Sequence, residues 1–277
     1  MRQLKSEKNM AAKNQGSSSM ASLMRSKKEG KKRRKMKVAI ISDIHSNLEA
    51  LQAVIKDIKK RRIKNIFCLG DLVGYGANPN ECIKLCLDES DATIAGNHDW
   101  ATLNKTDISN FNPVAASAVK WTMRHLSPEN AEKLQQLSLI YKTDNLLLVH
   151  ASPNKPEEWH YLLSFEEFQR EFNYFTEHIC FIGHSHIPSA IYQDENGYTD
   201  FLRDNPFPII KRRRYIVNVG SVGQPRDLDP RACYVIYDGN KGSIEFIRIE
   251  YNIPLAQQKI IDAGLPEALA ERLMVGK

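Results

Sequence analysis

Short apolar runs typical of buried strands recur along the chain, and each ends at a polar or glycine-containing cluster. The runs are Val38–Ser42, Asn65–Leu69, Ala92–Ala95, Leu146–Val149 and Ile179–Ile182. The segment after Asn47, a residue suited to cap a helix, has apolar residues at helical spacing from Leu48 to Ile58. The order strand, polar loop, helix predicts an α/β fold, in which functional groups collect beyond the carboxyl ends of the strands.

Cap and first-turn residues predict further helices. Asn78–Pro79 suits the start of a helix that runs through Asp88. Ser164 and Glu167 fit a capping box that opens a helix reaching about Glu177. The remaining helices are expected at Pro113–His125, Pro128–Leu137 and Pro266–Met274.

Beyond residue 186 the pattern changes to short strands joined by turns. The expected strands are Ser189–Gln193, Tyr198–Leu202, Arg214–Val219, Ala232–Tyr237 and Ser243–Tyr251. Turn signals such as Asp194–Gly197 and Asp238–Gly242 separate them. This spacing predicts a second, largely antiparallel sheet.

Length and composition favour a chain with a substantial core. The 277 residues allow one large domain or two small ones, and 42% of them are apolar. No run of about 18 apolar residues appears, and the basic N-terminus lacks the apolar stretch of a signal peptide. We therefore expect a cytoplasmic protein without a membrane segment. The cysteines show no CxxC spacing and are expected to be buried, reduced thiols; they are Cys68, Cys82, Cys86, Cys180 and Cys233.

The formal net charge of +6 is unevenly distributed. Residues 1–37 hold 13 Lys or Arg and 2 Glu, a net of +11, whereas the other 240 residues carry 26 basic and 31 acidic side chains, a net of −5. Residues 1–36 show no apolar periodicity and are expected to form a basic, disordered extension. One hypothesis is that this extension binds nucleic acid or an anionic surface. The other is that it is merely solvated or artefactual, with Met36 as the true initiator.

The polar clusters at the strand ends supply seven residues that can bind divalent metal ions. They are Asp43, His45, Asp71, Asn97, His150, His184 and His186. Asp, His and Asn side chains suit Mn²⁺, Fe²⁺ or Zn²⁺, and no thiolate is among them. Asp43 and His45 are two residues apart, and side chains at this spacing point the same way in an extended segment, so one metal can bind both. Because Asp71 adds a carboxylate able to bridge two ions, the series predicts a two-metal hydrolase.

These clusters resemble those of the calcineurin-like metallophosphoesterase superfamily, which carries the motifs DxH, GDxxxxG, GNHD, H and GHxH in this order. Here the corresponding residues are Asp43–His45, Gly70–Gly76, Gly96–Asp99, His150 and Gly183–His186. The resemblance covers residues 37–251 and leaves 252–277 as a C-terminal helical segment packed on that domain. It implies a four-layer αββα sandwich of two mixed β-sheets flanked by helices.

The resemblance also implies a role for each residue. One ion would be held by Asp43, His45 and His186 and the other by Asn97, His150 and His184, with Asp71 bridging them. Manganese is the metal expected first, with iron, zinc, nickel or magnesium as alternatives. A hydroxide between the ions would attack phosphorus in line, His98 would protonate the leaving oxygen as general acid, and Asp99 would orient or tune His98. The alternative for His98 is a structural histidine beside a ligand.

One motif departs from part of the superfamily. Protein phosphatases and symmetrical diadenosine tetraphosphate hydrolases carry GDxxDRG, whereas Gly70–Gly76 lacks the Asp-Arg pair. Similarity is closer to the prokaryotic phosphodiesterase-like branch, through Gly74–Pro79 and Asn218–Asp227. In the second segment, Arg226 is a candidate contact to a substrate phosphate, with a structural salt bridge as the alternative.

Two further features have competing interpretations. The run Lys211–Arg214 could contact nucleic acid, but a solvated charge run before an edge strand is the favoured interpretation. Trp100 and Trp159–Tyr161 could wall a substrate pocket or stack on a base, but aromatic residues also fill cores, and we do not assign them to the site.

The resulting hypothesis is a metal-dependent phosphodiesterase acting on a small phosphorylated substrate, with a nucleotide as one candidate. A phosphomonoesterase or nucleotide pyrophosphatase would use the same residues, because loops around a shared core select the substrate. A non-catalytic scaffold of the same fold is an alternative from another class, although the chain keeps all seven ligands and His98. Nucleic-acid binding is expected only through residues 1–36, and a homo-oligomer is compatible with the sequence.

Overall fold

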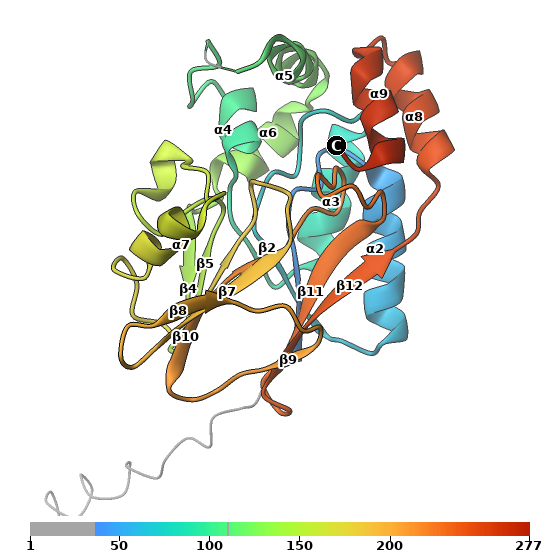
Figure 1. The fold of residues 1–277 in the computed structure, drawn as a ribbon. Coiled ribbons are helices and arrows are strands. Elements are labelled where there is room, and N and C mark those ends of the chain that lie inside the picture. Colours follow the sequence, from blue (N-terminus) through green and yellow to red (C-terminus); the bar gives the residue numbers. More distant parts are fainter. Residues whose placement is uncertain (1–36, 110) are drawn as a thin grey trace, which may run out of the picture. The chain divides into compact units, whose positions relative to one another are not determined.

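The computed structural model describes residues 37–109 and 111–277, whose fold is shown in Figure 1. The strands are β1 (Lys37–Ile41), β2 (Asn65–Cys68), β3 (Ala92–Thr93), β4 (Ile140–Lys142), β5 (Leu146–Val149), β6 (Ile179–Ile182), β7 (Ser189–Asp194), β8 (Thr199–Phe201), β9 (Phe207–Pro208), β10 (Arg213–Asn218), β11 (Ala232–Asp238) and β12 (Ser243–Ile249). The helices are α2 (Leu48–Lys60), α3 (Pro79–Glu89), α4 (Asn97–Thr102), α5 (Pro113–His125), α6 (Pro128–Gln135), α7 (Phe165–Glu171), α8 (Ile253–Asp262) and α9 (Glu267–Val275), with a 3₁₀ turn η1 (Pro156–Glu158). The basic extension expected at 1–36 lies outside the described residues.

Two mixed six-stranded sheets form the centre of the described part of the chain, as the family resemblance implied. Their strand orders are β3-β2-β1-β11-β12-β9 and β4-β5-β6-β10-β7-β8. In the first sheet β1, β2 and β3 are parallel, and β11 pairs antiparallel with β1. In the second, β5, β6 and β10 are parallel, and β7 pairs antiparallel with β10. The parallel strands of each sheet therefore deliver their carboxyl ends to one edge.

Alternating side chains divide the core into layers. In β1, Val38 and Ile40 belong to the cluster between the two sheets, whereas Ala39 and Ile41 pack toward α2 and α3 on the outer face of the first sheet. A third cluster joins the outer face of β5 and β6 to α7. Together these clusters give the order helix, sheet, sheet, helix, which is visible in Figure 1. The five cysteines are buried in these layers and free.

The expectation of a separate antiparallel sheet after residue 186 is wrong. β11 and β12 join β1 in the first sheet, whereas β7, β8 and β10 join β6 in the second. Most residues of β10 and β11 are buried, which suits a central strand of either sheet. Turn signals fix where such strands begin and end, but the partner of a buried strand is decided by long-range packing.

Helix starts agree with the sequence better than helix ends. Asn47 caps α2 by accepting the Ala50 N–H at 3.1 Å, and the Ser164 capping box opens α7. However, α7 ends at Glu171 rather than near Glu177. The chain turns there because Phe172 and Phe175 enter the core beneath the helix.

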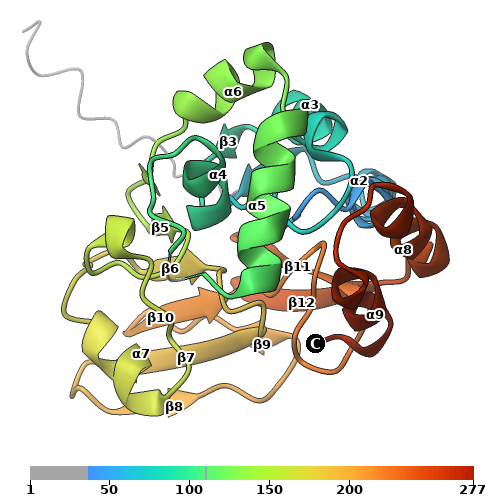
Figure 2. The same ribbon diagram turned by 90° about the horizontal axis from the view of Figure 1, so that it is seen from above.

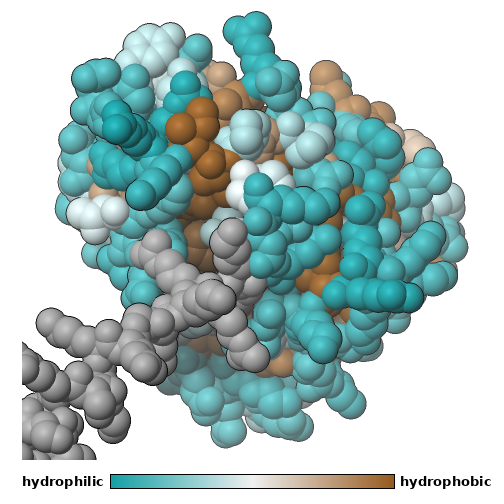
Figure 3. Space-filling model, turned by 90° about the horizontal axis from the view of Figure 1, so that it is seen from below, coloured by the Kyte–Doolittle hydropathy of each residue, from teal (hydrophilic) through white to brown (hydrophobic). Residues whose placement is uncertain are grey.

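The C-terminal helices and α5 lie above the strand ends. Figure 2 shows α5, α8 and α9 on the side toward which the parallel strands run. An apolar cluster joins Tyr75 and Ala118 to Leu269 and Leu273 of α9. The opposite side, in Figure 3, is mainly hydrophilic with narrower hydrophobic strips. Within residues 37–109 and 111–277, no helix is both long and apolar enough to cross a membrane.

Candidate metal centre

All seven residues expected as metal ligands lie together beyond the carboxyl ends of the parallel strands. Asp43 and His45 follow β1, Asp71 follows β2, Asn97 follows β3, His150 follows β5, and His184 and His186 follow β6. Each is buried. The convergence arises because these strands occupy neighbouring positions in two facing sheets and end at the same edge.

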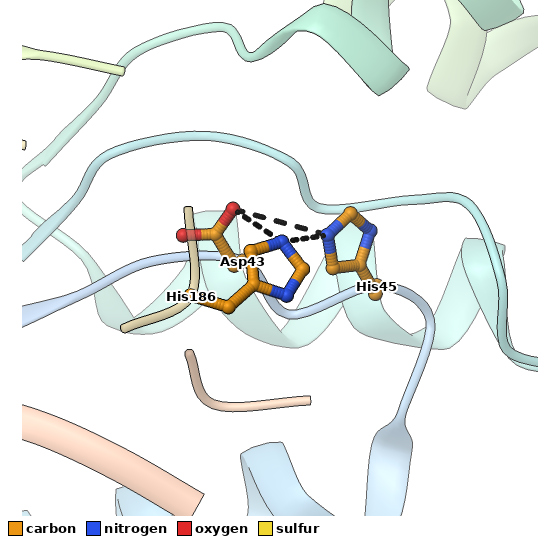
Figure 4. Close-up of side chains that lie close together, drawn as sticks. All are labelled: Asp43, His45 and His186. Carbon is orange, nitrogen blue, oxygen red and sulfur yellow. Dashed lines mark hydrogen bonds and ion pairs between the residues drawn. The ribbon is translucent and has the colours of Figure 1, made fainter. Parts of the chain in front are cut away.

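The first group consists of Asp43, His45 and His186, drawn in Figure 4. The His186 Nε2 atom lies 3.2 Å from Asp43 Oδ1, and the His45 Nε2 atom lies 3.8 Å from the same oxygen. The two Nε2 atoms are 3.0 Å apart. Three ligand atoms from two strands therefore face one point.

The second group consists of Asp71, His150 and His184. The His150 Nε2 atom lies 3.3 Å from Asp71 Oδ2 and 3.2 Å from Asn97 Oδ1. Asp71 Oδ2 is also 3.6 Å from the His45 Nε2 atom of the first group. Asp71 thus stands between the two groups, as a bridging carboxylate would.

Main-chain carbonyl groups fix the orientation of three imidazoles. The pairs are His45 Nδ1 with Val73 O at 3.0 Å, His150 Nδ1 with Leu69 O at 2.8 Å and His186 Nδ1 with Gln224 O at 2.6 Å. A carbonyl oxygen only accepts, so each Nδ1 carries the hydrogen and Nε2 points inward. For neutral His45 and His186, two lone pairs then face each other, an arrangement that a cation between them would stabilise.

Burial keeps several of these imidazoles neutral. It lowers the pKa of His45 well below its usual value, lowers the pKa of His184 to about 3, and also lowers the pKa of His186. Neutral imidazole is the form that binds metals. In addition, His184 Nε2 and Asp71 Oδ2 are buried without a hydrogen-bond partner among the described residues. These nitrogen and oxygen atoms are suitable ligands for a divalent metal ion.

The acidic side of the centre is charged. Burial opposes ionisation of Asp43 and Asp71, but neighbouring histidines outweigh it and hold the pKa of both carboxyls well below the usual range. Burial likewise opposes charge on His150, yet Asp71 and Asp43 raise its pKa to about 9. A divalent cation beside these carboxylates would compete with that proton.

The backbone at the centre is unusual. Positive φ angles occur at Asp43 (54°), His45 (50°), Asp71 (52°), His184 (65°) and His186 (62°). Non-glycine residues rarely adopt this left-handed conformation, and such residues concentrate at functional sites. The expectation that Asp43 and His45 share a direction because their segment is extended is therefore wrong. Their side chains converge through a left-handed turn.

Asp99 acts on the loop after β2. Its Oδ2 atom accepts the N–H groups of Asp71 and Gly96 at 2.9 Å, and its Oδ1 atom accepts those of Leu72 and Val73 at 2.9 and 3.3 Å. Burial and the Asp71 charge raise the Asp99 pKa to about 7, against the effect of these hydrogen bonds. That Asp99 orients or tunes His98 stays a prediction, and the hydrogen bonds of Asp99 position the main chain at Asp71.

His98 lies at the rim of the first group. Its ring centroid is 4.5 Å from that of Tyr75 and 4.9 Å from that of His45. It also forms a third candidate cluster with His45 and Asp71. Burial lowers its pKa to about 4, and its Nδ1 atom has no hydrogen-bond partner within the described residues. A Cβ on Gly74, whose φ is +92°, would lie 2.6 Å from this Nδ1 atom, so glycine leaves the space for the ring.

Arg226 reaches the same rim from the loop after β10. Its Nη2 atom donates to Gln224 Oε1 at 2.8 Å and to the Tyr75 hydroxyl at 3.4 Å. These partners are neutral, so the contacts of Arg226 differ from the structural salt bridge considered as the alternative. The Nε atom is buried without a partner among the described residues. Arg226 is thus placed to attract an anion.

Within the basic run, two arginines have structural contacts. Arg214 donates to the carbonyl oxygens of Phe172 and Phe175 at 2.8 and 2.7 Å. Arg212 pairs with Glu195 at 3.1 Å. Arg214 therefore ties β10 to the segment after α7, and Arg212 belongs to an exposed ion pair.

Sequence reasoning left two aromatic neighbours of the centre unassigned. The Tyr161 ring stacks on His184 with centroids 4.0 Å apart, and the Trp159 ring lies 5.9 Å from that of His150. Their sequence positions, nine and eleven residues after His150, were the available signal. Tyr75 was also missed, although Gly74 and Gly76 flank it within the motif Gly70–Gly76.

The fold and the centre together define an α/β protein with a candidate metal site between two mixed sheets. The chain belongs to the calcineurin-like phosphoesterase superfamily, whose domain model matches residues 36–242. Membership of this family supports a hydrolase.

Similar proteins agree with this assignment. Protein MJ0912 of Methanocaldococcus jannaschii is 44% identical over 248 residues, which are 88% of this chain and 99% of that protein. A metallophosphoesterase from Sphaerobacter thermophilus has a solved structure with a TM-score of 0.77 and 38% identity, covering 88% of this chain and all of that one. The structure of PH1004 from Pyrococcus horikoshii, at 21% identity and a TM-score of 0.69, shares the fold over 87% of this chain and 99% of that one.

Proposed function

We propose that the protein is a metal-dependent phosphodiesterase that uses two divalent ions, with manganese the first candidate. One ion would be held by Asp43, His45 and His186 and the other by Asn97, His150 and His184, with Asp71 shared. The observation that carries the proposal is the pair of adjacent groups joined through Asp71, whose Oδ2 atom lies 3.3 Å from His150 Nε2 and 3.6 Å from His45 Nε2.

When bound, the ions would neutralise charge on the phosphoryl oxygens and generate a nucleophile from water. The protein residues have separate tasks. His98 lies at the rim, where its imidazolium form would donate a proton to the leaving oxygen, and a bound phosphate anion would favour that form by raising the His98 pKa. Arg226 offers a guanidinium to a phosphate oxygen. Asp99 keeps Asp71 in place through the main chain.

Hydrolysis of bis-p-nitrophenyl phosphate and p-nitrophenyl phosphate tests the proposal. Protein stripped of metal is assayed before and after reloading with Mn²⁺, and bound metal is counted by elemental analysis. Asp71→Asn removes the shared carboxylate charge. Asp88→Asn, at an exposed position of α3, is the matched control.

Three outcomes are informative. Diester hydrolysis that returns with metal, fails in Asp71→Asn and persists in Asp88→Asn supports the phosphodiesterase. Preference for the monoester favours the phosphomonoesterase alternative. Inactivity toward both compounds despite two bound ions per chain contradicts the proposal as tested and favours a scaffold.

A further inference from the structure

An aromatic surface borders the His150 and His184 side of the candidate metal centre. We call Trp100, Trp159 and Tyr161 the aromatic shelf. The Tyr161 ring is stacked on the His184 imidazole, with centroids 4.0 Å apart and planes inclined by 25°. The Trp159 ring meets His150 edge-on at 5.9 Å and Trp100 edge-on at 5.4 Å. The shelf therefore contacts two candidate ligands of the same ion.

Tyr161 is not a core residue. Its exposed fraction is 47%, although one face of its ring is covered by His184. Large aromatic side chains that stay half exposed beside a polar centre are common in ligand-binding surfaces, because a flat ring contributes much contact area with little loss of conformational freedom. The open side of the Tyr161 ring is thus available to another flat group.

The backbone that presents the shelf is held in a rare conformation. Trp159 has φ 56° and ψ 38°, and Lys155, at the other end of η1, has φ 48° and ψ 68°. Bulky residues seldom adopt left-handed angles, and such positions gather at functional sites. A Lys155 to Glu158 ion pair of 2.7 Å and a main-chain hydrogen bond of 2.9 Å between the same residues brace the turn.

A cationic group borders the other group of ligands in the same centre. The Tyr75 hydroxyl is 3.4 Å from Arg226 Nη2, and the Tyr75 ring lies 4.6 Å from that of His45. Tyr161 covers His184 of the second group. A ligand that spans the centre would meet an aromatic ring near His184 and a guanidinium near His45. This pairing suits a molecule with a planar ring and a phosphate.

We propose that the aromatic shelf binds the planar ring of an organic phosphodiester by stacking on Tyr161, while the phosphate group lies at the metal centre. The substrate class is then an aromatic phosphate ester, with a nucleotide as the biological form. This inference rests on the proposed function and narrows it.

Equilibrium binding to Mn²⁺-loaded protein, measured by calorimetry, tests the shelf separately from turnover. Adenosine 5′-monophosphate and ribose 5-phosphate differ only in the base. Phenylphosphonate and methylphosphonate form a second pair that cannot be hydrolysed at phosphorus. We expect the ring to strengthen binding about ten-fold, the order of one base–aromatic stack.

The variants separate stacking from simple packing. Tyr161→Phe should keep the preference for the ring-bearing ligand, whereas Tyr161→Leu, which still covers His184, and Tyr161→Ala should abolish it. Tyr198→Ala, at a tyrosine that is 58% exposed between β7 and β8, is the control and should retain it. Counting bound metal in each variant shows whether the centre is intact.

The two ligand pairs identify the ring. If the ring-bearing ligand binds more tightly in both pairs, the shelf accepts any aromatic group. If it binds more tightly only in the adenosine pair, the shelf requires a nucleobase. Either result supports the proposal. Equal binding within both pairs in the wild type overturns it, as does equal weakening of all four ligands in Tyr161→Leu. Because diester hydrolysis is assayed independently, loss of the shelf would leave the proposed function standing.

Discussion

The Nε2 atoms of His45 and His186 lie 3.0 Å apart, although each ring directs its Nδ1 hydrogen to a main-chain carbonyl oxygen. Both rings are neutral because burial lowers their pKa. Neither Nε2 atom can donate to the other in this state. The lone pairs of the two Nε2 atoms therefore repel each other. A cation bound between them would be coordinated by both atoms and would remove this repulsion.

Metal binding should consequently stabilise the fold. A ligand that binds only the folded state contributes about 2.7 kcal/mol when its concentration is 100 times its Kd. For a chain of this size, that corresponds to a rise in Tm of about 5–10 °C. The measurement is thermal unfolding of metal-stripped protein titrated with Mn²⁺.

Two variants test whether His186 is a ligand of the metal ion that raises Tm. His186→Ala should flatten the dependence of Tm on Mn²⁺, whereas His125→Ala, at an exposed position of α5, should keep it. An unchanged metal response in His186→Ala would remove His186 from the ligand set.

Asp99→Asn should weaken both the fold and the centre. The amide has one acceptor oxygen, so two of the four main-chain N–H groups now satisfied by Asp99 would face an NH₂ group. Above its pKa of about 7 Asp99 is a carboxylate, and hydrogen bonds to charged groups contribute about 1.5–3 kcal/mol each. Removing the Asp99 charge also relieves its repulsion with the Asp71 carboxylate. The expected net loss in the free energy of unfolding is therefore about 2–4 kcal/mol.

Urea unfolding and metal counting check this expectation. Asp107→Asn, in which the replaced carboxylate caps only an exposed local turn at Ser109, is the control. Normal metal content in a destabilised Asp99→Asn protein would mean that the loop keeps Asp71 in place by other contacts.

Acid should weaken the stabilising interaction between Asp229 and Arg231 in a defined pH range. Asp229 accepts hydrogen bonds from Arg231, among them those from Nε at 2.9 Å and Nη2 at 2.6 Å, and these lower the Asp229 pKa from 3.8 to about 2. A lowered carboxyl pKa stabilises the fold fully above the unfolded value, and this contribution is lost as pH falls through the folded value. The stabilising effect of Asp229 should therefore fade between about pH 5 and pH 2.

Comparing wild type with Asp229→Asn in urea at pH 7 and pH 2 measures this contribution. The difference in free energy of unfolding should be full at pH 7 and mostly lost at pH 2. Asp88→Asn should show no such change, and a difference that is independent of pH would assign the effect of Asp229→Asn to packing.

The ligand positions were predictable because two local signals coincide. An apolar run of strand length ends immediately before Asp43, and a similar run ends before Asp71. Parallel strands bring such positions to one edge whatever their separation in sequence. Convergence therefore followed from the strand pattern and the residue types together.

The remaining features depend on long-range packing. Pairing of β11 with β1 joins residues about 200 positions apart, and no turn signal encodes it. The left-handed angle at His184 is set by its surroundings, since non-glycine residues of any type adopt it only rarely. Likewise, the stacking of Tyr161 on His184 arises from the loop around η1, whose path cannot be derived from its composition.

His98→Ala should lower turnover while both ions stay bound. A general acid contributes about 10²–10⁴-fold, and its contribution grows as the leaving group becomes more basic. The variant should therefore lose more activity toward a phenyl ester than toward a p-nitrophenyl ester, because p-nitrophenolate leaves readily without a proton. Steady-state kcat for the two diesters, with metal content counted in parallel, makes the comparison.

Besides the structural alternative, His98 has a second alternative role as a metal ligand, since it clusters with His45 and Asp71. Loss of bound metal in His98→Ala, with equal loss of activity toward both esters, would establish that alternative. Phe111→Leu is the control for packing, because the Phe111 ring lies 5.4 Å from that of His98 and carries no proton to donate. A leaving-group dependence seen in His98→Ala but absent in Phe111→Leu would assign the proton transfer to the imidazole itself.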